Sequence, residues 1–153
     1  MTEEKISFMD LALAEARAAA ERGEVPVGAV LADGATGKIL ARAGNCTEEL
    51  KDPTAHAEML VIRAAATQEG LKRLQDADLY VTLEPCAMCA AAISFARLRR
   101  LYFGASDPKG GAVEHGPRFF AQSTCHHRPE VYGGISENEA ATLLRTFFQK
   151  RRD

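Results

Sequence analysis

The chain has 153 residues, of which 46% are hydrophobic and 26% charged, so it can build a sizeable core without disulfide bonds. Its 19 Lys and Arg against 21 Asp and Glu give a formal charge of -2, which excludes a protein that coats nucleic acid through overall charge. The longest apolar run, residues 87–96, is too short to cross a bilayer, and residues 1–5 are acidic where a secretory signal is basic. We therefore expect one domain over residues 1–153, located in the cytoplasm and without membrane contact.

The first half of the chain alternates between helical and strand patterns. Residues 8–21 place apolar or small side chains on one helical face. Two β-rich runs, 25–31 and 39–43, flank a glycine-containing turn at 33–37 and should pair antiparallel. A second helix is expected to begin near Thr54, after a capping Asp52 and a proline, and to end near Gly70.

The second half continues this alternation. A short apolar strand at 79–83 leads directly into a helix over 86–97 that is apolar on nearly every side, which favours burial against a sheet and a partner subunit. Further strands are expected at 101–103 and 130–132, and a C-terminal helix at 137–150. Alternating strands and helices predict an α/β fold in which helices pack on a mixed sheet.

The chemically most informative residues are His56, Glu58, Cys86 and Cys89. One imidazole and two thiolates suit Zn²⁺, and three protein ligands leave one tetrahedral position open, as in catalytic sites. Cys86 and Cys89 are three positions apart behind a proline at a helix start, so both sulfurs can reach one ion. Unpaired N–H groups at that helix start also favour the thiolate over the thiol.

His56 and Glu58 are two positions apart, so in a regular helix their side chains would point roughly 200° away from each other. They can share a site only at a helix terminus. We therefore predict that His56 is a metal ligand at the start of its helix and that Glu58 reaches the open position without binding the ion. Two helix starts would then meet at the carboxyl ends of the strands, where open α/β sheets keep their ligand crevices.

A zinc site with an unliganded carboxylate beside it predicts a hydrolase, because the carboxylate can take a proton from water and pass it to the substrate. Such a shuttle suits attack on an amidine-like ring carbon, which is hydrolytic deamination. The C-x-x-C pair alone is also compatible with a structural zinc knuckle or a redox pair, and a structural module could bind RNA without chemistry. No second C-x-x-C and no paired His at knuckle spacing follows.

Four segments resemble bacterial tRNA-specific adenosine deaminases of the cytidine/deoxycytidylate deaminase superfamily: VPVGAV at 25–30, DPTAHAE at 52–58, LYVTLEPCAMC at 79–89 and FGASDPK at 103–109. The resemblance implies a cytidine-deaminase-like three-layer α/β/α sandwich with a mixed five-stranded sheet, one Zn²⁺ per subunit, no organic cofactor, and a homodimer. It implies deamination of adenosine to inosine at the wobble position of a tRNA anticodon stem-loop. The alternative within this chemistry is a deaminase of a free base or nucleoside such as guanine, cytosine or cytidine.

The resemblance also implies roles for individual residues. Zinc ligation falls to His56, Cys86 and Cys89, and proton transfer falls to Glu58. The residues implied to contact the substrate or the RNA are Asn45, Asp107, Lys109, Phe147, Phe148 and Arg152. Aromatic rings beside cations suit unstacked RNA bases, although Phe147 and Phe148 can equally be core residues and the basic C-terminus a solvated helix end.

Residues 114–128 depart from the commoner pattern of these deaminases. Cys125, His126 and His127 suggest a second metal site, but adjacent residues rarely converge on one ion, so we do not expect one. Cys46 is expected to be a packed or inert thiol.

Overall fold

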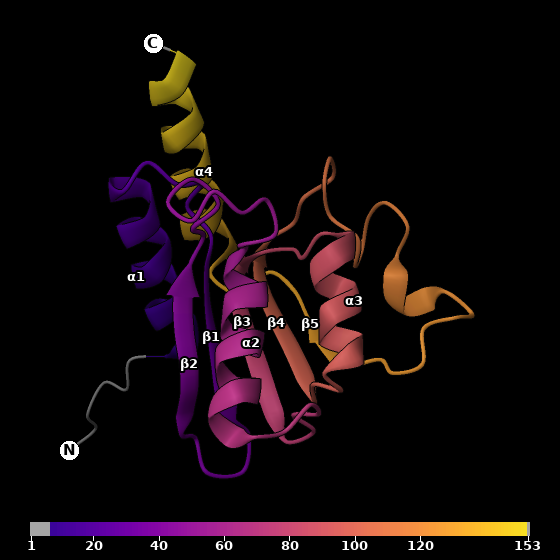
Figure 1. The fold of residues 1–153 in the computed structure, drawn as a ribbon. Helices are drawn as coiled ribbons and strands as arrows, with labels where there is room; N and C mark the ends of the chain where they lie inside the picture. The colour runs from indigo at the N-terminus through magenta and orange to yellow at the C-terminus, as the bar shows by residue number, and fades with distance from the viewer. Residues whose placement is uncertain (1–6, 153) are drawn as a thin grey trace, which may run out of the picture.

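The computed structural model describes residues 7–152, which form one sheet between two layers of helices (Figure 1). Residues 1–6 and 153, including the acidic N-terminal stretch considered above, lie outside the described residues. The strands follow the order β2 (Ile39–Gly44), β1 (Gly28–Asp33), β3 (Ala77–Leu83), β4 (Arg100–Ala105) and β5 (Glu130–Tyr132). β1 runs antiparallel to β2 and β3, whereas β3, β4 and β5 are parallel, so the expected mixed five-stranded sheet is confirmed.

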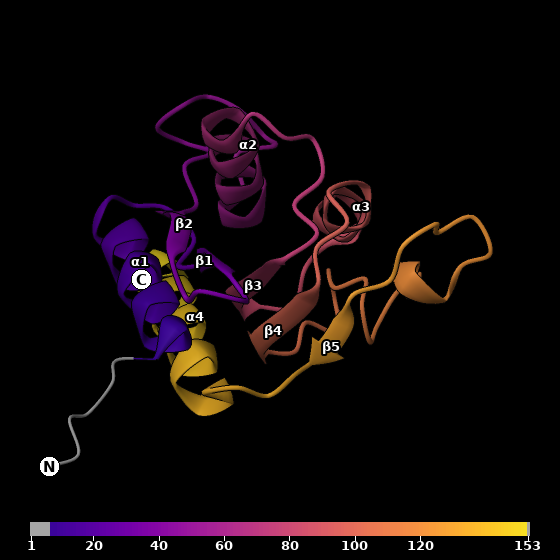
Figure 2. The ribbon, with the colours of Figure 1, turned by 90° about the horizontal axis from the view of Figure 1, so that it is seen from below.

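Helices cover both faces of the sheet. α1 (Phe8–Glu21) and α4 (Glu137–Arg152) lie on one face, and α2 (Ala57–Glu69) and α3 (Ala87–Phe95) lie on the other, as the view along the layers shows (Figure 2). A single 3-10 turn, Phe119–Ala121, lies beside α3. The expected three-layer α/β/α sandwich is therefore confirmed.

Strand alternation builds a core on each side of the sheet. On the α2 and α3 side the largest buried side chains include Leu31, Leu79 and Phe103. On the opposite face Tyr80, Tyr102 and Tyr132 occupy paired positions of β3, β4 and β5, and their rings stack with centroids 4.5 and 5.0 Å apart. These cross-strand contacts help to hold the parallel half of the sheet in register.

Several helix boundaries differ from the sequence-based expectation, and α4, for example, ends two residues after the expected residue 150. α2 begins at Ala57 and not near Thr54, because the Asp52 side chain accepts hydrogen bonds from the amide and the hydroxyl of Thr54 and forms a local turn. α3 ends at Phe95, two residues before the expected end, and Arg97 then adopts a φ of 60° as the chain turns toward β4. The expected end of α2 at Gly70 is confirmed, since Gly70 closes the helix with a φ of 67°.

The topology brings the ends of several strands to one edge of the sheet. β2, β3 and β4 end there and β1 begins there, so the segments 45–56, 84–86 and 106–118 all leave the sheet at this edge. Within residues 7–152, no helix combines the length and the hydropathy needed to cross a bilayer.

At Gly28 the backbone of α1 lies close against the sheet. A Cβ at this position would overlap the Ala12 carbonyl oxygen and lie 2.5 Å from the Ala16 amide nitrogen. Both are backbone atoms that cannot move aside, so Gly28→Ala is expected to destabilise the fold by about 1–3 kcal/mol, as overpacked cores do. Thermal or urea unfolding measures this change.

Gly34→Ala provides a control for this prediction. The atoms nearest to a Cβ at Gly34 belong to the end of the flexible Arg99 side chain, so this substitution should cost clearly less. Equal unfolding midpoints for the two variants would contradict the proposed contact between α1 and β1.

Candidate metal centre and active site

Three possible metal ligands from two helix starts converge at this edge of the sheet. His56 Nδ1 lies 3.7 Å from Cys86 Sγ and 3.6 Å from Cys89 Sγ. The three donor atoms lie within 4.8 Å of one another and form the one such cluster found in residues 7–152. Cys89 is buried, whereas His56 and Cys86 are partly accessible.

Two N-cap positions explain this convergence. His56 is the N-cap of α2 and Cys86 is the N-cap of α3, both with extended backbone, and neither side chain caps its own helix. Both side chains are therefore free to point at a common centre. Cys89 lies on the first turn of α3, where its sulfur joins that of Cys86.

The donor set fits a zinc ion. Tetrahedral zinc with nitrogen at about 2.0 Å and sulfur at about 2.3 Å requires separations of about 3.6 Å between these donors. The observed separations of 3.7 and 3.6 Å match that requirement. His56, Cys86 and Cys89 would hold the ion and leave the fourth position to other groups.

The two thiols influence each other strongly. A hydrogen bond from Cys89, supported by one with His56, lowers the pKa of Cys86 to about 4. The hydrogen bond with Cys86, together with burial, raises the pKa of Cys89. A thiolate is thus available at the start of α3, which is the form that binds metals.

Glu58 lies beside this cluster but is not part of it. It is the second residue of α2, lines the same pocket as His56 and Cys86, and is only 4% exposed. Burial raises the pKa of Glu58 to about 7, and the negative charge of Cys86 acts in the same direction. A carboxyl group with a pKa near neutrality can both take up and release a proton at working pH.

The pocket in front of the cluster has a volume of about 290 Å³. Asn45 lies in its wall with its side-chain oxygen accepting a hydrogen bond of 2.8 Å from the Ala57 amide. That bond commits the oxygen, so the amide nitrogen of Asn45 is the group left to donate to a ligand. Val25, Val27 and Leu83 add apolar wall, which suits a flat heterocycle.

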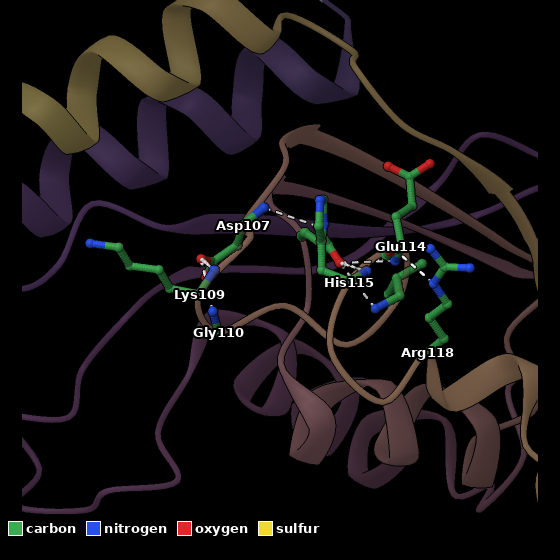
Figure 3. A network of polar contacts seen from close by, with 8 residues as sticks. Asp107, Lys109, Gly110, Glu114, His115 and Arg118 are labelled. Carbon is green, nitrogen blue, oxygen red and sulfur yellow. Dashed lines mark hydrogen bonds and ion pairs between the residues drawn. The ribbon is translucent and has the colours of Figure 1, made fainter.

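Asp107 and Gly110 form one rim of this pocket, and Figure 3 shows the contacts that shape it. The Asp107 carboxylate accepts hydrogen bonds from the amides of Lys109 and Gly110. The Lys109 side chain points away from this network and is exposed, so Lys109 does not line the pocket.

Glu84, which lies between β3 and Cys86, is a functional candidate that was not predicted from the sequence. Its carboxylate is buried, and although burial alone would raise the pKa, hydrogen bonds from Asp107, His115 and neighbouring amides lower the pKa of Glu84 below its usual value. One indirect signal in the sequence is Gly111, because glycine is the residue that permits a close approach of the backbone to another group. A Cβ there would lie 2.5 Å from the Glu84 carboxylate.

The C-terminal helix lies outside the pocket. Phe147 is half-buried and Phe148 is 45% exposed, so the alternative of two core residues is wrong for Phe148. The Arg151 guanidinium lies 4.7 Å from the Phe147 ring centre and donates to the carbonyl of Gly23, two residues before pocket-lining Val25. Arg152 is exposed. This end of α4 therefore contacts the segment that leads to Val25 but contributes no residue to the pocket.

The other cysteines are engaged elsewhere. Cys125 donates to the His127 carbonyl and lies 3.6 Å from the Ser94 hydroxyl, while the His127 ring donates to the carbonyl of Leu98. These side chains point to different partners, so no metal cluster forms there within the described part of the chain. Burial raises the pKa of Cys46, which keeps this thiol protonated and unreactive.

Bound zinc is expected to be released on acidification, because protons compete with the metal for the imidazole and both thiolates. Zinc content measured against pH should fall steeply below about pH 6, since the three ligands are lost together. Cys46→Ala should follow the same curve as the unmodified chain, since Cys46 is outside the cluster. Zinc occupancy that does not change with pH would contradict this ligand set.

Comparisons with known proteins agree with the geometry. Residues 2–105 match the model of the cytidine and deoxycytidylate deaminase zinc-binding region. The chain is 64% identical over 149 residues to a tRNA-specific adenosine deaminase of Agrobacterium fabrum, covering 97% of both chains, and 44% identical over 152 residues to that of Bacillus subtilis, covering 99% of this chain and 92% of the relative.

Among solved structures, one from work on A-to-I editing by tRNA:A34 deaminases at the wobble position of transfer RNA matches with a TM-score of 0.88 and 64% identity. The match covers 92% of this chain and all of that chain. The donor cluster, the fold and these similarities lead to one conclusion: the chain belongs to the cytidine and deoxycytidylate deaminase zinc-binding family.

Proposed function

We propose that the protein is a zinc-dependent hydrolase that converts adenosine to inosine at the wobble position of a tRNA anticodon. The observation that carries this proposal is the buried Glu58, held beside a His56, Cys86 and Cys89 cluster without joining it. The relatives named tRNA-specific adenosine deaminases support the substrate, because their similarity extends over nearly the whole chain.

Each residue of the site has a distinct role in this proposal. His56, Cys86 and Cys89 hold the zinc ion, which when bound supplies a Lewis acid for the activation of water. Glu58 accepts a proton from the attacking water and delivers it to the ring nitrogen next to C6 of adenine. It then assists proton transfer to the amine, which leaves as ammonia. Asn45 orients the nucleoside through its free amide nitrogen.

The surfaces around the pocket are proposed to hold the rest of the anticodon loop. Asp107 shapes the pocket rim, and Lys109 offers an exposed cation on the same segment. Near the end of α4, Phe148 and Arg152 are exposed. An aromatic ring beside a cation suits an unstacked base and its phosphate. Phe147, half-covered by Arg151, supports this surface.

We further propose that residues 1–153 act as one domain in the cytoplasm. A single sheet continues through the described residues and packs on helices on both faces, which supports one unit. A tRNA substrate and free thiols, which all four cysteines have, fit a reducing compartment.

Incubation with an anticodon stem-loop that carries adenosine at the wobble position tests the substrate. Mass spectrometry of the digested RNA should detect inosine. Free guanine, cytosine and cytidine, tested in parallel, should remain unchanged. Turnover of the small molecules without turnover of the stem-loop would reject the tRNA proposal in favour of a free-base or nucleoside deaminase.

Glu58→Gln tests the proton-transfer role within the same assay. It preserves the shape of the side chain but removes its ability to take up a proton, so the turnover rate should fall by about 10²–10⁴-fold. Zinc content should stay at one ion per chain, because Glu58 is outside the ligand cluster. Full activity in this variant would refute the assignment.

A homodimer is proposed from the outer face of α3. This face carries apolar side chains at Met88, Ala91, Ala92 and Phe95, and Phe95 is 74% exposed. Ile62 of α2 continues the same apolar surface beside Phe95. A large exposed aromatic side chain within an apolar patch is typical of a subunit interface.

Phe95→Glu is expected to convert the dimer into a monomer, because it replaces the most exposed aromatic side chain of the apolar face with a charge. The dissociation constant of the dimer should rise at least about 100-fold, as at an interface hot spot. Light scattering over a concentration series measures this. Ile39→Glu is the control, because Ile39 is an exposed apolar residue on the edge strand β2. This variant should keep the molecular mass of the dimer in solution. A monomeric unmodified chain would exclude the proposed interface.

A further inference from the structure

We infer that Glu84 is a positioning residue for the substrate, whose carboxylate joins the pocket rim at Asp107–His115 to the metal-binding start of α3. This inference rests on the proposed deaminase function for its kinetic consequence, but its structural part stands on contacts in the described chain. Glu84 lies beside the pocket with a fully buried side chain and is not proposed to take part in bond making or breaking.

Five N–H groups surround the Glu84 carboxylate. Oε1 accepts hydrogen bonds of 2.9 Å from the Asp107 amide and 2.8 Å from the His115 ring nitrogen Nδ1. Oε2 accepts bonds of 3.1, 2.9 and 3.1 Å from the amides of Val113, Glu114 and His115. The donors come from both ends of one segment (Figure 3), so the carboxylate closes that segment into a loop.

Apart from bonds within the segment, the rim has few other contacts: the Phe119 amide donates to the Ala112 carbonyl, and Val113 packs against the core. Residues 106–118 contain no helix or strand, so no regular hydrogen-bond ladder fixes their backbone. One further bond, from the Ala112 amide to the Pro85 carbonyl, attaches the segment to the same short stretch that bears Glu84. The segment 84–85, which directly precedes the ligand Cys86, therefore accepts most of the hydrogen bonds that attach the rim to the rest of the fold.

Gly111 permits this arrangement. A Cβ at this position would lie 2.5 Å from the Glu84 carboxylate and 2.6 Å from the Asp107 carbonyl oxygen, so a larger residue would push the segment away. The close approach lets the buried carboxylate accept hydrogen bonds from all five N–H donors.

The consequence for the substrate follows from what the segment carries. Asp107 and Gly110 line the pocket, and the Asp107 side chain holds the turn between them. If the hydrogen bonds to the Glu84 carboxylate break, the rim can move relative to Cys86 and the zinc site. An RNA loop that must contact the rim and the metal site together would then bind less well, while the metal ligands and Glu58 keep their places.

Glu84→Gln is the main test, with the anticodon stem-loop as substrate. The amide keeps the size of the side chain but presents an NH₂ group to backbone donors, so some of the five bonds must break. KM should rise about tenfold or more, while kcat changes less than about threefold and zinc stays at one ion per chain. An unchanged KM, a loss confined to kcat, or a loss of zinc would overturn the inference.

Two further variants perturb the same contacts and keep the test valid if Glu84→Gln does not fold. His115→Ala removes only the ring donor from a half-exposed side chain, so it should fold and raise KM by a smaller factor, about threefold. Gly111→Ala displaces the segment without changing the carboxylate and should raise KM as Glu84→Gln does.

Asp78→Asn is the matched control. Asp78 is also a buried acid on β3, but it pairs with Arg99 at the opposite end of that strand. This variant should lower the melting temperature without changing KM, and an equal rise in KM would show that Glu84 acts only through general stability.

Hydrogen exchange separates this inference from the proposed function. The amides of Asp107, Val113, Glu114 and His115 should be protected in the unmodified chain and should exchange faster in Glu84→Gln. An unmodified chain that does not deaminate the stem-loop would count against the proposed function alone. Unchanged exchange in Glu84→Gln would overturn the role of Glu84 whatever the substrate.

Discussion

The site depends on two helices whose first residues lie at the same edge of the sheet and whose N-cap residues have an extended backbone. His56 precedes α2 and Cys86 precedes α3, and neither side chain caps its own helix. Inside a helix, His56 and Glu58 would point in different directions. At a helix start, one side chain can bind a metal while the other lies beside it. The sheet makes this possible, because the segments before both helices leave it at one edge.

Two buried glutamates near this edge of the sheet have opposite pKa shifts because their surroundings differ. Glu58 is buried with few donors, so its pKa rises to about 7 and its proton becomes exchangeable near neutral pH. Glu84 is equally buried but receives five N–H groups, so it stays charged and acts as a structural anchor. In the proposed function, proton transfer falls to Glu58, whereas Glu84 holds the pocket rim.

Much of the fold and of the metal site could be predicted from the sequence. Hydrophobic periodicity located the strands and helices, and residue chemistry with spacing located the three donors and Glu58. The start of α2 was misplaced because Asp52 can cap a helix or form a local turn with Thr54, and the sequence does not distinguish these uses. Glu84 was not predicted because its donors lie 23–31 positions away and four of the five are backbone N–H groups, which no residue type encodes.

X-ray absorption spectroscopy at the zinc edge, on the unmodified chain and on Glu58→Ala, tests the central claim most directly. We expect two sulfur neighbours at about 2.3 Å and two nitrogen or oxygen neighbours at about 2.0 Å, with the same sulfur and imidazole signals in both proteins. A shell of four sulfurs, or the loss of an oxygen ligand together with the ion in Glu58→Ala, would contradict a carboxylate that stands beside the metal without binding it.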